Sequence, residues 1–212
     1  MKQFNILNIN NKIFKEEKMT QYKSIAEHYT DKSRMQHPER KHMIYPTWLE
    51  VCGDVQDLRI LNLGCGGGDS SRLLALKGAK VVGIDKEEAM LEITIRKEKE
   101  NPLNIEYLLA SANNLPLFEK KIDLITPAFL LHYARSKKEL REIIKNIAAN
   151  LKPNGRLVGI NHHIKNYILQ PKLPNSQLII EWAEGSKVVV TIYKTKKESF
   201  CFNNFFLEAY YL

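Results

Sequence analysis

Residues 60–68 read Ile-Leu-Asn-Leu-Gly-Cys-Gly-Gly-Gly, a short apolar run that leads directly into glycines. An apolar run of this length predicts a buried strand, and the glycines predict a tight turn after it. We expect Asp69 or Ser70 to cap a helix behind the turn, and Gly78 to end that helix. The stretch therefore predicts a strand, a glycine turn and a helix in succession.

The same alternation extends outward from this stretch. A helix is expected from 46 to 53 before it, and a strongly amphipathic helix at 138–151 after it. Strands that are apolar on both faces and alternate with helices predict an α/β fold. This fold is a Rossmann-like, open, mostly parallel sheet with helices on both faces. The further strands are expected at residues 80–85, 104–109, 121–126 and 156–160.

The C-terminal part follows another pattern. The runs 178–182 and 187–193 flank Glu184-Gly185-Ser186, which predicts an antiparallel hairpin added to the parallel sheet. The aromatic tail 200–211 offers a third antiparallel strand. These aromatic residues can cap an apolar pocket, or they can serve core packing or a dimer surface.

Composition excludes several classes of protein. The chain of 212 residues is 44% hydrophobic and 26% charged, which is typical of a globular domain. No apolar run approaches the roughly 18 residues that cross a bilayer, and the N-terminal residues lack the apolar core of a secretory signal. Cys52, Cys65 and Cys201 lie far apart, which argues against a disulfide framework or a metal site. We therefore expect a cytoplasmic protein without a membrane segment.

The net charge of +8 has two interpretations. It can indicate a nucleic-acid surface, or it can reflect general use of lysine among the polar residues. Basic residues are interspersed with acids at 12–18 and 96–100, which favours the second interpretation.

The spacing of the glycines restricts the ligand. A turn of this kind without a ligand is one alternative, but glycines at the carboxyl end of a strand also let a ligand approach the backbone. A dinucleotide fingerprint would place its third glycine at position 69, which is Asp69. An acid there repels the pyrophosphate that the start of a helix otherwise attracts. The loop therefore favours a nucleoside without a phosphate over NAD.

Asp85 ends the second predicted strand about 20 residues after the loop, where an acid can accept hydrogen bonds from ribose hydroxyls. It can equally cap the helix that begins at Lys86. The two roles are compatible.

Together these residues resemble the class I S-adenosylmethionine-dependent methyltransferase family. The matching segments occur in the same order as in the family, and they extend from about Tyr22 to Ile160. The segments that carry it are 60–68, 81–85, 110–117, 129–133 and 151–157. It implies a methyltransferase with S-adenosylmethionine as the cofactor, and no metal. Residues 1–18 are rich in Asn and Lys with little periodicity, so we expect a mobile extension there. The remainder is expected to form a single domain at 19–212, with a cofactor-binding core at 53–160 and a cap or edge hairpin at 161–212.

The resemblance also implies roles for particular residues. Gly64, Cys65 and Gly66 line the methionyl and ribose portions of the cofactor, and Asp85, with Lys86 beside it, lies at the ribose. Ser111 and Ala112 face the adenine, and Phe129 lies beneath the methionine end. Tyr22 or Tyr29 in an N-terminal helix closes over the cofactor.

Three features depart from the family pattern. Asn62 stands where an acid is usual, and Ser111 stands where an aspartate is frequent. The family also continues beyond the hairpin through another helix and two strands, so we expect a shortened C-terminal part. These departures keep a cofactor-binding protein with degenerate activity among the alternatives.

The acceptor is less defined than the cofactor. Orientation and exclusion of water drive much of a methyl transfer, so a general base is optional. The candidates for substrate contact near the expected strand ends, each of which can also be a packing or loop residue, are His132, Tyr133, His162 and His163. The segment 126–129 lacks the Asn/Asp-Pro-Pro sequence of nucleobase methyltransferases. We therefore expect a small-molecule acceptor, with an RNA methyltransferase as the alternative and an NAD-linked oxidoreductase as a distant one.

Overall fold

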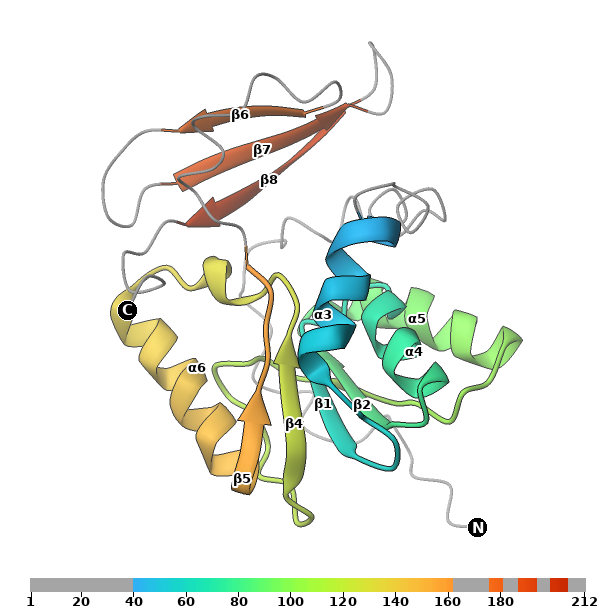
Figure 1. The fold of residues 1–212 in the computed structure, drawn as a ribbon. Coiled ribbons are helices and arrows are strands. Elements are labelled where there is room, and N and C mark those ends of the chain that lie inside the picture. The colour runs from blue at the N-terminus through green and yellow to red at the C-terminus, as the bar shows by residue number, and fades with distance from the viewer. Residues whose placement is uncertain (1–39, 162–175, 181–186, 194–198, 206–212) are drawn as a thin grey trace.

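The computed structural model describes residues 40–161 and the three strands 176–180, 187–193 and 199–205 of the chain (Figure 1). Its centre is a five-stranded sheet in the order β3-β2-β1-β4-β5, and every neighbouring pair is parallel. The strands are β1 (Arg59–Leu63), β2 (Lys80–Asp85), β3 (Glu106–Leu109), β4 (Ile122–Pro127) and β5 (Leu151–Leu157).

Helices cover both faces of this sheet, as the sequence predicts (Figure 1). α3, α4 and α5 lie on one face, and α6 lies on the other. The helical elements are the short π-helix η1 (Arg40–Ile44), α3 (Tyr45–Cys52), α4 (Asp69–Leu76), α5 (Glu88–Glu100), the 3-10 turn η2 (Leu131–Tyr133) and α6 (Lys137–Asn150). In the described part of the chain, no helix has both the length and the apolar character to cross a bilayer.

The two-residue period of a strand divides the core into two layers. On β1, Ile60 packs towards α3, α4 and α5, whereas Leu61 packs towards α6. Both side chains are fully buried, so the run at 60–63 contributes apolar side chains to both layers of the core. This double burial is why the strands read as continuous apolar runs rather than alternating ones.

The strand order reverses at β1, because β2 lies on one side of it and β4 on the other. At such a point the two connections leave the sheet in opposite directions and open a crevice at the carboxyl ends of the strands. The glycine turn at 64–68 follows β1 directly. The topology therefore places this turn in the crevice.

The prediction that a side chain caps the start of α4 is wrong. Neither Asp69 nor Ser70 caps the helix; the N-cap residue is Gly68, with a φ of 82°. A Cβ at this position would lie 2.8 Å from Cγ2 of Thr94 and 3.1 Å from the hydroxyl of Tyr107. Backbone conformation and close packing thus both require glycine here.

The start of β5 also differs from the prediction. The turn expected at 153–155 does not precede the strand but lies inside it, because β5 begins at Leu151, directly after α6. The register with β4 shifts between Leu151 and Arg156, which absorbs these residues as a bulge. Beyond β5, Val158 and Ile160 still donate backbone hydrogen bonds to β4.

A second sheet contains the antiparallel strands β6 (Ser176–Ile180), β7 (Lys187–Tyr193) and β8 (Ser199–Phe205), in that order. It lies beyond the carboxyl ends of β4 and β5 (Figure 1). Trp182, which ends the predicted run 178–182, lies outside the described residues.

Candidate cofactor-binding site

The glycine loop between β1 and α4 adopts left-handed backbone at three positions. The φ angles are 66° at Gly64, 53° at Gly66 and 82° at Gly68. The loop is joined to β2 through a hydrogen bond of 2.9 Å from the Cys65 amide to the carbonyl of Ile84. It therefore lies against the end of β2, where Asp85 is found.

Asp85 binds the loop and the start of the next helix at the same time. Its Oδ2 accepts a hydrogen bond of 2.7 Å from the Gly66 amide, and its Oδ1 accepts one of 3.0 Å from the Glu87 amide. Its neighbour Lys86 is exposed. The carboxylate thus supports the turn before α5, and it also holds Gly66 in place.

Burial raises the pKa of Asp85 from an ordinary value of 3.8 to about 6. The backbone hydrogen bonds from Glu87 and Gly66 oppose this rise, the nearby Glu87 carboxylate adds to it, and Lys86 lowers the pKa slightly. At neutral pH Asp85 is therefore a buried carboxylate, which is a strong acceptor for hydroxyl groups.

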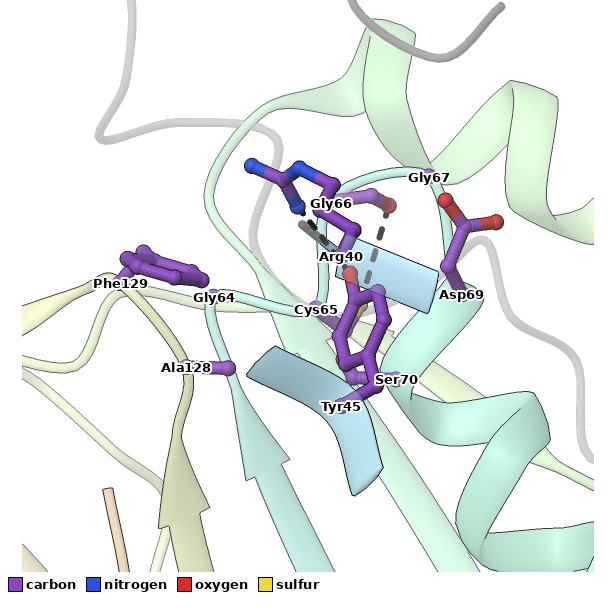
Figure 2. A pocket seen from close by; sticks show the side chains of 10 residues that line it. All are labelled: Arg40, Tyr45, Gly64, Cys65, Gly66, Gly67, Asp69, Ser70, Ala128 and Phe129. Carbon is purple, nitrogen blue, oxygen red and sulfur yellow. Dashed lines mark hydrogen bonds between the residues drawn. The ribbon is translucent and has the colours of Figure 1, made fainter. Parts of the chain in front are cut away.

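A pocket opens in front of the loop (Figure 2). Four of its lining residues were expected from the sequence: Gly64, Cys65, Gly66 and Phe129. The residues that line it are Arg40, Tyr45, Gly64, Cys65, Gly66, Gly67, Asp69, Ser70, Ala128 and Phe129. The loop and the end of β4, which are far apart in the sequence, thus both line one pocket.

Arg40 and Tyr45 are pocket residues that sequence reasoning missed. Arg40 donates a hydrogen bond of 3.2 Å from Nη1 to the hydroxyl of Tyr45. Its guanidinium carbon lies 5.4 Å from the ring centre of Phe129, within the range of a cation–π contact. Only the folding of η1 over the sheet brings them here, and no spacing in the segment 30–46 indicates it.

Phe129 has a φ of 59°, a left-handed conformation that costs a residue with a Cβ about 1–2 kcal/mol. Its amide donates a hydrogen bond of 2.7 Å to the carbonyl of Ile160, which holds the strained turn after β4. Backbone strain of this kind is concentrated at functional sites. The conformation places the ring at the pocket wall (Figure 2).

Asn62 supports the loop from beneath, where the family usually has an acid. In the amide orientation that satisfies both ends, its Oδ1 accepts from the Ser70 hydroxyl at 2.7 Å and the Ser71 amide at 3.0 Å. Its Nδ2 donates to the carbonyl of Thr126 at 3.0 Å. A carboxylate would lack this donor, so the substitution suits its fully buried surroundings.

Ser111 and Ala112 do not line the pocket described above. They follow β3, whose next residue, Ala110, donates a hydrogen bond of 3.0 Å to the carbonyl of Asp85. The hydroxyl of Ser111 accepts a hydrogen bond of 3.3 Å from the Asn113 amide, within a local turn. Their role at the adenine stays a prediction.

The catalytic candidates divide into two groups. His132 is 3% exposed, and its Nδ1 lies 3.3 Å from Oδ1 of Asn161. The ring of Tyr133 packs on His132, with ring centres 4.4 Å apart. Both residues lie on η2, just beyond Phe129. His162, His163, Tyr22 and Tyr29 lie outside the described residues.

Cys65 is buried in the loop, and burial raises the pKa of its thiol well above the ordinary value, with a further contribution from Asp85. A thiol with a raised pKa stays protonated at neutral pH and is a weak nucleophile. Cys65 therefore contributes packing rather than covalent chemistry.

Comparisons with known proteins agree with this geometry. Residues 60–155 match the family model described as a methyltransferase domain. A ubiquinone biosynthesis O-methyltransferase of Coxiella burnetii is 33% identical over 132 residues, which are 60% of this chain and 55% of that protein. The chain thus spans about half the length of such curated relatives.

Two solved structures extend the comparison. The CcbJ methyltransferase of Streptomyces caelestis matches 90% of this chain and 83% of its own, with a TM-score of 0.67 and 18% identity, which shows a common fold. An S-adenosylmethionine dependent methyltransferase of Mesorhizobium loti is 26% identical, with a TM-score of 0.51 over 64% of this chain and 59% of its own.

Proposed function

We propose that the chain is a class I S-adenosylmethionine-dependent methyltransferase, which transfers a methyl group from S-adenosylmethionine to a small-molecule acceptor. The observation that carries this proposal is the pairing of Asp85 with the glycine loop, 2.7 Å from Oδ2 to the Gly66 amide. Asp85 is buried and does not itself line the pocket, but it is joined to a loop residue that does. The pairing supports the proposal because it lies at the carboxyl end of β2, where a ribose acceptor is expected.

The residues present fit this cofactor. A Cβ built on Gly66 would meet no protein atom within 4 Å, so the loop leaves open space in front of its backbone. Asp69 lines the same pocket at the start of α4, where its negative charge opposes a pyrophosphate. The cofactor residues that we propose are Gly64, Cys65, Gly66, Asp85, Lys86, Ser111, Ala112, Phe129 and Tyr22.

Arg40 adds a cation to this pocket. Its guanidinium, held by Tyr45 and lying over Phe129, can pair with the carboxylate of the methionyl group. The aromatic rings beside it offer negative faces to a sulfonium. Both contacts favour a cofactor with an amino-acid end.

When bound, S-adenosylmethionine would supply the methyl group to the acceptor atom, with S-adenosylhomocysteine as the leaving group. The acceptor must lose a proton when it is a hydroxyl group. In the tautomer in which Nδ1 of His132 donates to Asn161, Nε2 would be the nitrogen that takes this proton. Tyr133 then packs against the imidazole and fixes its orientation.

The acceptor that we propose is an oxygen on a small aromatic molecule. The aromatic wall formed by Tyr45 and Phe129 suits a flat apolar ring. The name of the Coxiella burnetii relative, an O-methyltransferase of ubiquinone biosynthesis, supports oxygen as the acceptor atom. A cytoplasmic location belongs to the same proposal and is supported by the free, buried Cys52 and Cys65.

The net charge of +8 favours RNA as the second candidate substrate. RNA binding would weaken steeply as salt is added, because phosphate contacts release counterions. Within residues 40–161, however, several cations pair with acids instead of forming a single-sign surface. Such pairs are Arg72–Glu98, Lys80–Asp57, Lys97–Asp69 and Lys152–Asp123.

Calorimetry with S-adenosylhomocysteine tests the proposed function directly. We expect binding at about micromolar affinity, as is usual for small-molecule sites with a few polar contacts. Transfer of labelled methyl groups to a panel of dihydroxybenzoates and to total RNA then separates the two substrate classes. A folded chain that does not bind S-adenosylhomocysteine would rule out the methyltransferase function, and one that binds but methylates nothing would indicate degenerate activity.

A further inference from the structure

Helix α5 directs two polar side chains at the glycine loop instead of at solvent. Thr94 and Lys97 lie one helical turn apart, so they share the face of α5 that packs against the loop. Each donates a hydrogen bond to a loop carbonyl. Neither residue lines the pocket, so they would act on a ligand only through the loop.

Thr94 fixes the centre of the loop. Its hydroxyl, which is buried, donates a hydrogen bond of 2.8 Å to the carbonyl of Gly66. The amide of the same glycine donates to Oδ2 of Asp85 at 2.7 Å. Both peptide groups of Gly66 are therefore held, which removes freedom that a glycine otherwise retains.

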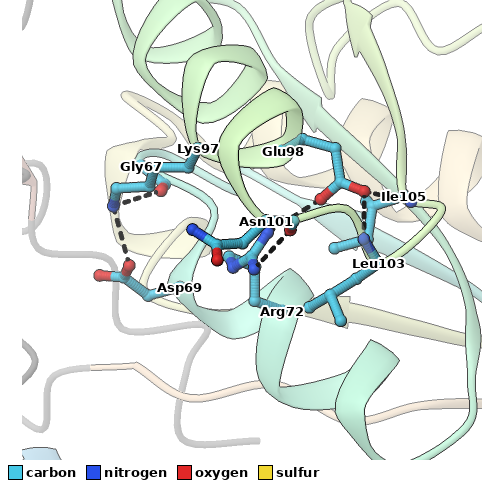
Figure 3. Close-up of polar contacts among 8 residues, drawn as sticks. All are labelled: Gly67, Asp69, Arg72, Lys97, Glu98, Asn101, Leu103 and Ile105. Atoms are coloured by element: carbon cyan, nitrogen blue, oxygen red, sulfur yellow. Dashed lines mark hydrogen bonds and ion pairs between the residues drawn. The ribbon is translucent and has the colours of Figure 1, made fainter.

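Lys97 fixes the next residue and balances a charge. Its Nζ donates to the carbonyl of Gly67 at 2.9 Å and to Oδ1 of Asp69 at 3.1 Å (Figure 3). Gly67 and Asp69 both line the pocket. The ammonium group thus joins the loop to the first residue of α4 and compensates the negative charge of Asp69.

A separate network holds α5 at the distance that these contacts need. Arg72 on α4 forms an ion pair of 2.9 Å with Glu98 and donates to the carbonyl of Asn101 at 2.8 Å (Figure 3). Glu98 also accepts hydrogen bonds from the amides of Leu103 and Ile105. The position of α5 is therefore set independently of the loop.

We propose that Thr94 and Lys97 are positioning residues that hold the glycine loop in its binding conformation before the cofactor arrives. A loop that is already ordered loses less conformational entropy on binding, so these contacts increase affinity without touching the ligand. The inference rests on the proposed function, because the ligand is the cofactor of the same site.

The experiment compares Thr94→Val with Thr94→Ser. Valine keeps the shape of threonine but lacks the hydroxyl, whereas serine keeps the hydroxyl. S-adenosylhomocysteine titrations at pH 8, where Asp85 is ionised, should show about tenfold weaker binding for Thr94→Val and at most about a twofold change for Thr94→Ser. Lys97→Met should weaken binding about fivefold, and Lys99→Met, on the exposed surface of α5, should match the wild type.

Each outcome decides the inference. Wild-type affinity in Thr94→Val, or an equal loss in Thr94→Ser, would overturn it. If Thr94→Val does not fold, Lys97→Met against Lys97→Arg makes the same comparison at the second contact, since arginine keeps a donor and the charge. A folded wild-type chain without affinity for S-adenosylhomocysteine overturns the proposed function as well, whereas wild-type binding with unaffected variants overturns this inference alone.

Discussion

The wall of the pocket that the glycine loop forms is held by hydrogen bonds from β2 and α5, whereas the wall at the end of β4 is held by aromatic contacts. On the first wall, Asp85 and Thr94 fix both peptide groups of Gly66. On the second, Phe129 adopts a strained conformation under Arg40; His132 and Tyr133, which pack on each other, follow it in the chain but do not line the pocket.

The difference indicates which of the two walls can change its side chains more readily. A hydrogen-bonded backbone wall suits a ligand that stays constant, because each donor and acceptor has a fixed partner. Aromatic side chains are held by packing instead of paired donors and acceptors, so exchange of one ring for another of similar volume is tolerated. We therefore expect the first wall to serve the cofactor alone, and the second wall to contact both the methionine end of the cofactor and the acceptor.

Gly68→Ala should break the first wall and have the largest effect. The positive φ and the approach to Thr94 and Tyr107 together should lower the free energy of unfolding by about 3–4 kcal/mol. Urea denaturation measures this loss. The matched control is Gly66→Ala, which has a positive φ but no close atom and should lose only about 1–2 kcal/mol. Equal losses in the two variants would show that packing under the loop is unimportant.

His132→Gln should affect methyl transfer without affecting cofactor binding. Loss of a general base should lower the rate of methyl transfer about 100-fold at saturating cofactor, while the affinity for S-adenosylhomocysteine stays unchanged. Initial rates and calorimetry test the two parts. Tyr133→Phe, which keeps the ring, serves as the control. A weakened cofactor affinity in His132→Gln would place this histidine on the first wall instead.

The pH dependence of cofactor binding tests whether Asp85 acts as a hydrogen-bond acceptor for the cofactor. Since its pKa is about 6, acidification protonates the acceptor, and affinity should fall about tenfold per pH unit below that value. In the free protein, acidification has the opposite effect on folding stability. The folded state binds this proton more tightly than the unfolded state does, so the contribution to stability falls as pH rises from about 4 to about 6.

Calorimetry between pH 5 and 8, at about half-unit steps, measures the affinity. Asp85→Asn is the control, because it binds weakly and should show no such dependence. An equal slope in the variant would assign the titration to another group.

Trp48→Phe should have the smallest effect. Nε1 of Trp48 donates a buried hydrogen bond of 3.0 Å to the hydroxyl of Thr126, which joins α3 to β4 behind both walls. Its loss should cost about 1–2 kcal/mol of unfolding free energy and leave cofactor affinity intact. Urea denaturation of Trp48→Phe, Thr126→Val and the double variant tests this, because the losses of two interacting partners are not additive.

Several features of the fold could be predicted because they follow from local chemistry. Each apolar run of the sheet is buried on both sides, so strands and helices alternate visibly in the sequence. Asp85 could be placed beside the loop, because parallel pairing sets Leu63 opposite Ile84 and the next residues meet. Gly68 as the N-cap and the bulge in β5 were missed, because they depend on Thr94 beneath the loop and on the register with β4.

The residues of the candidate site also divide into those that local sequence predicts and those that depend on tertiary contacts. Gly64, Cys65, Gly66 and Phe129 were expected in the pocket, whereas Arg40 lies on a segment whose composition indicates only a polar connection. Thr94 has the spacing of an ordinary buried helix residue, so its hydrogen bond to the loop has no signal in the sequence. These contacts arise between elements that the sheet brings together.

The sequence by itself determined the alternating fold and the glycine loop with its acid, because burial patterns and backbone requirements act over a few residues. Only the tertiary structure decided which side chains brace the loop and which residues form the other wall. A hydrogen bond such as the one from Thr94 to Gly66 depends on the relative position of two elements to within a fraction of an ångström. That position is the outcome of packing the whole core, and no local pattern of residues records it.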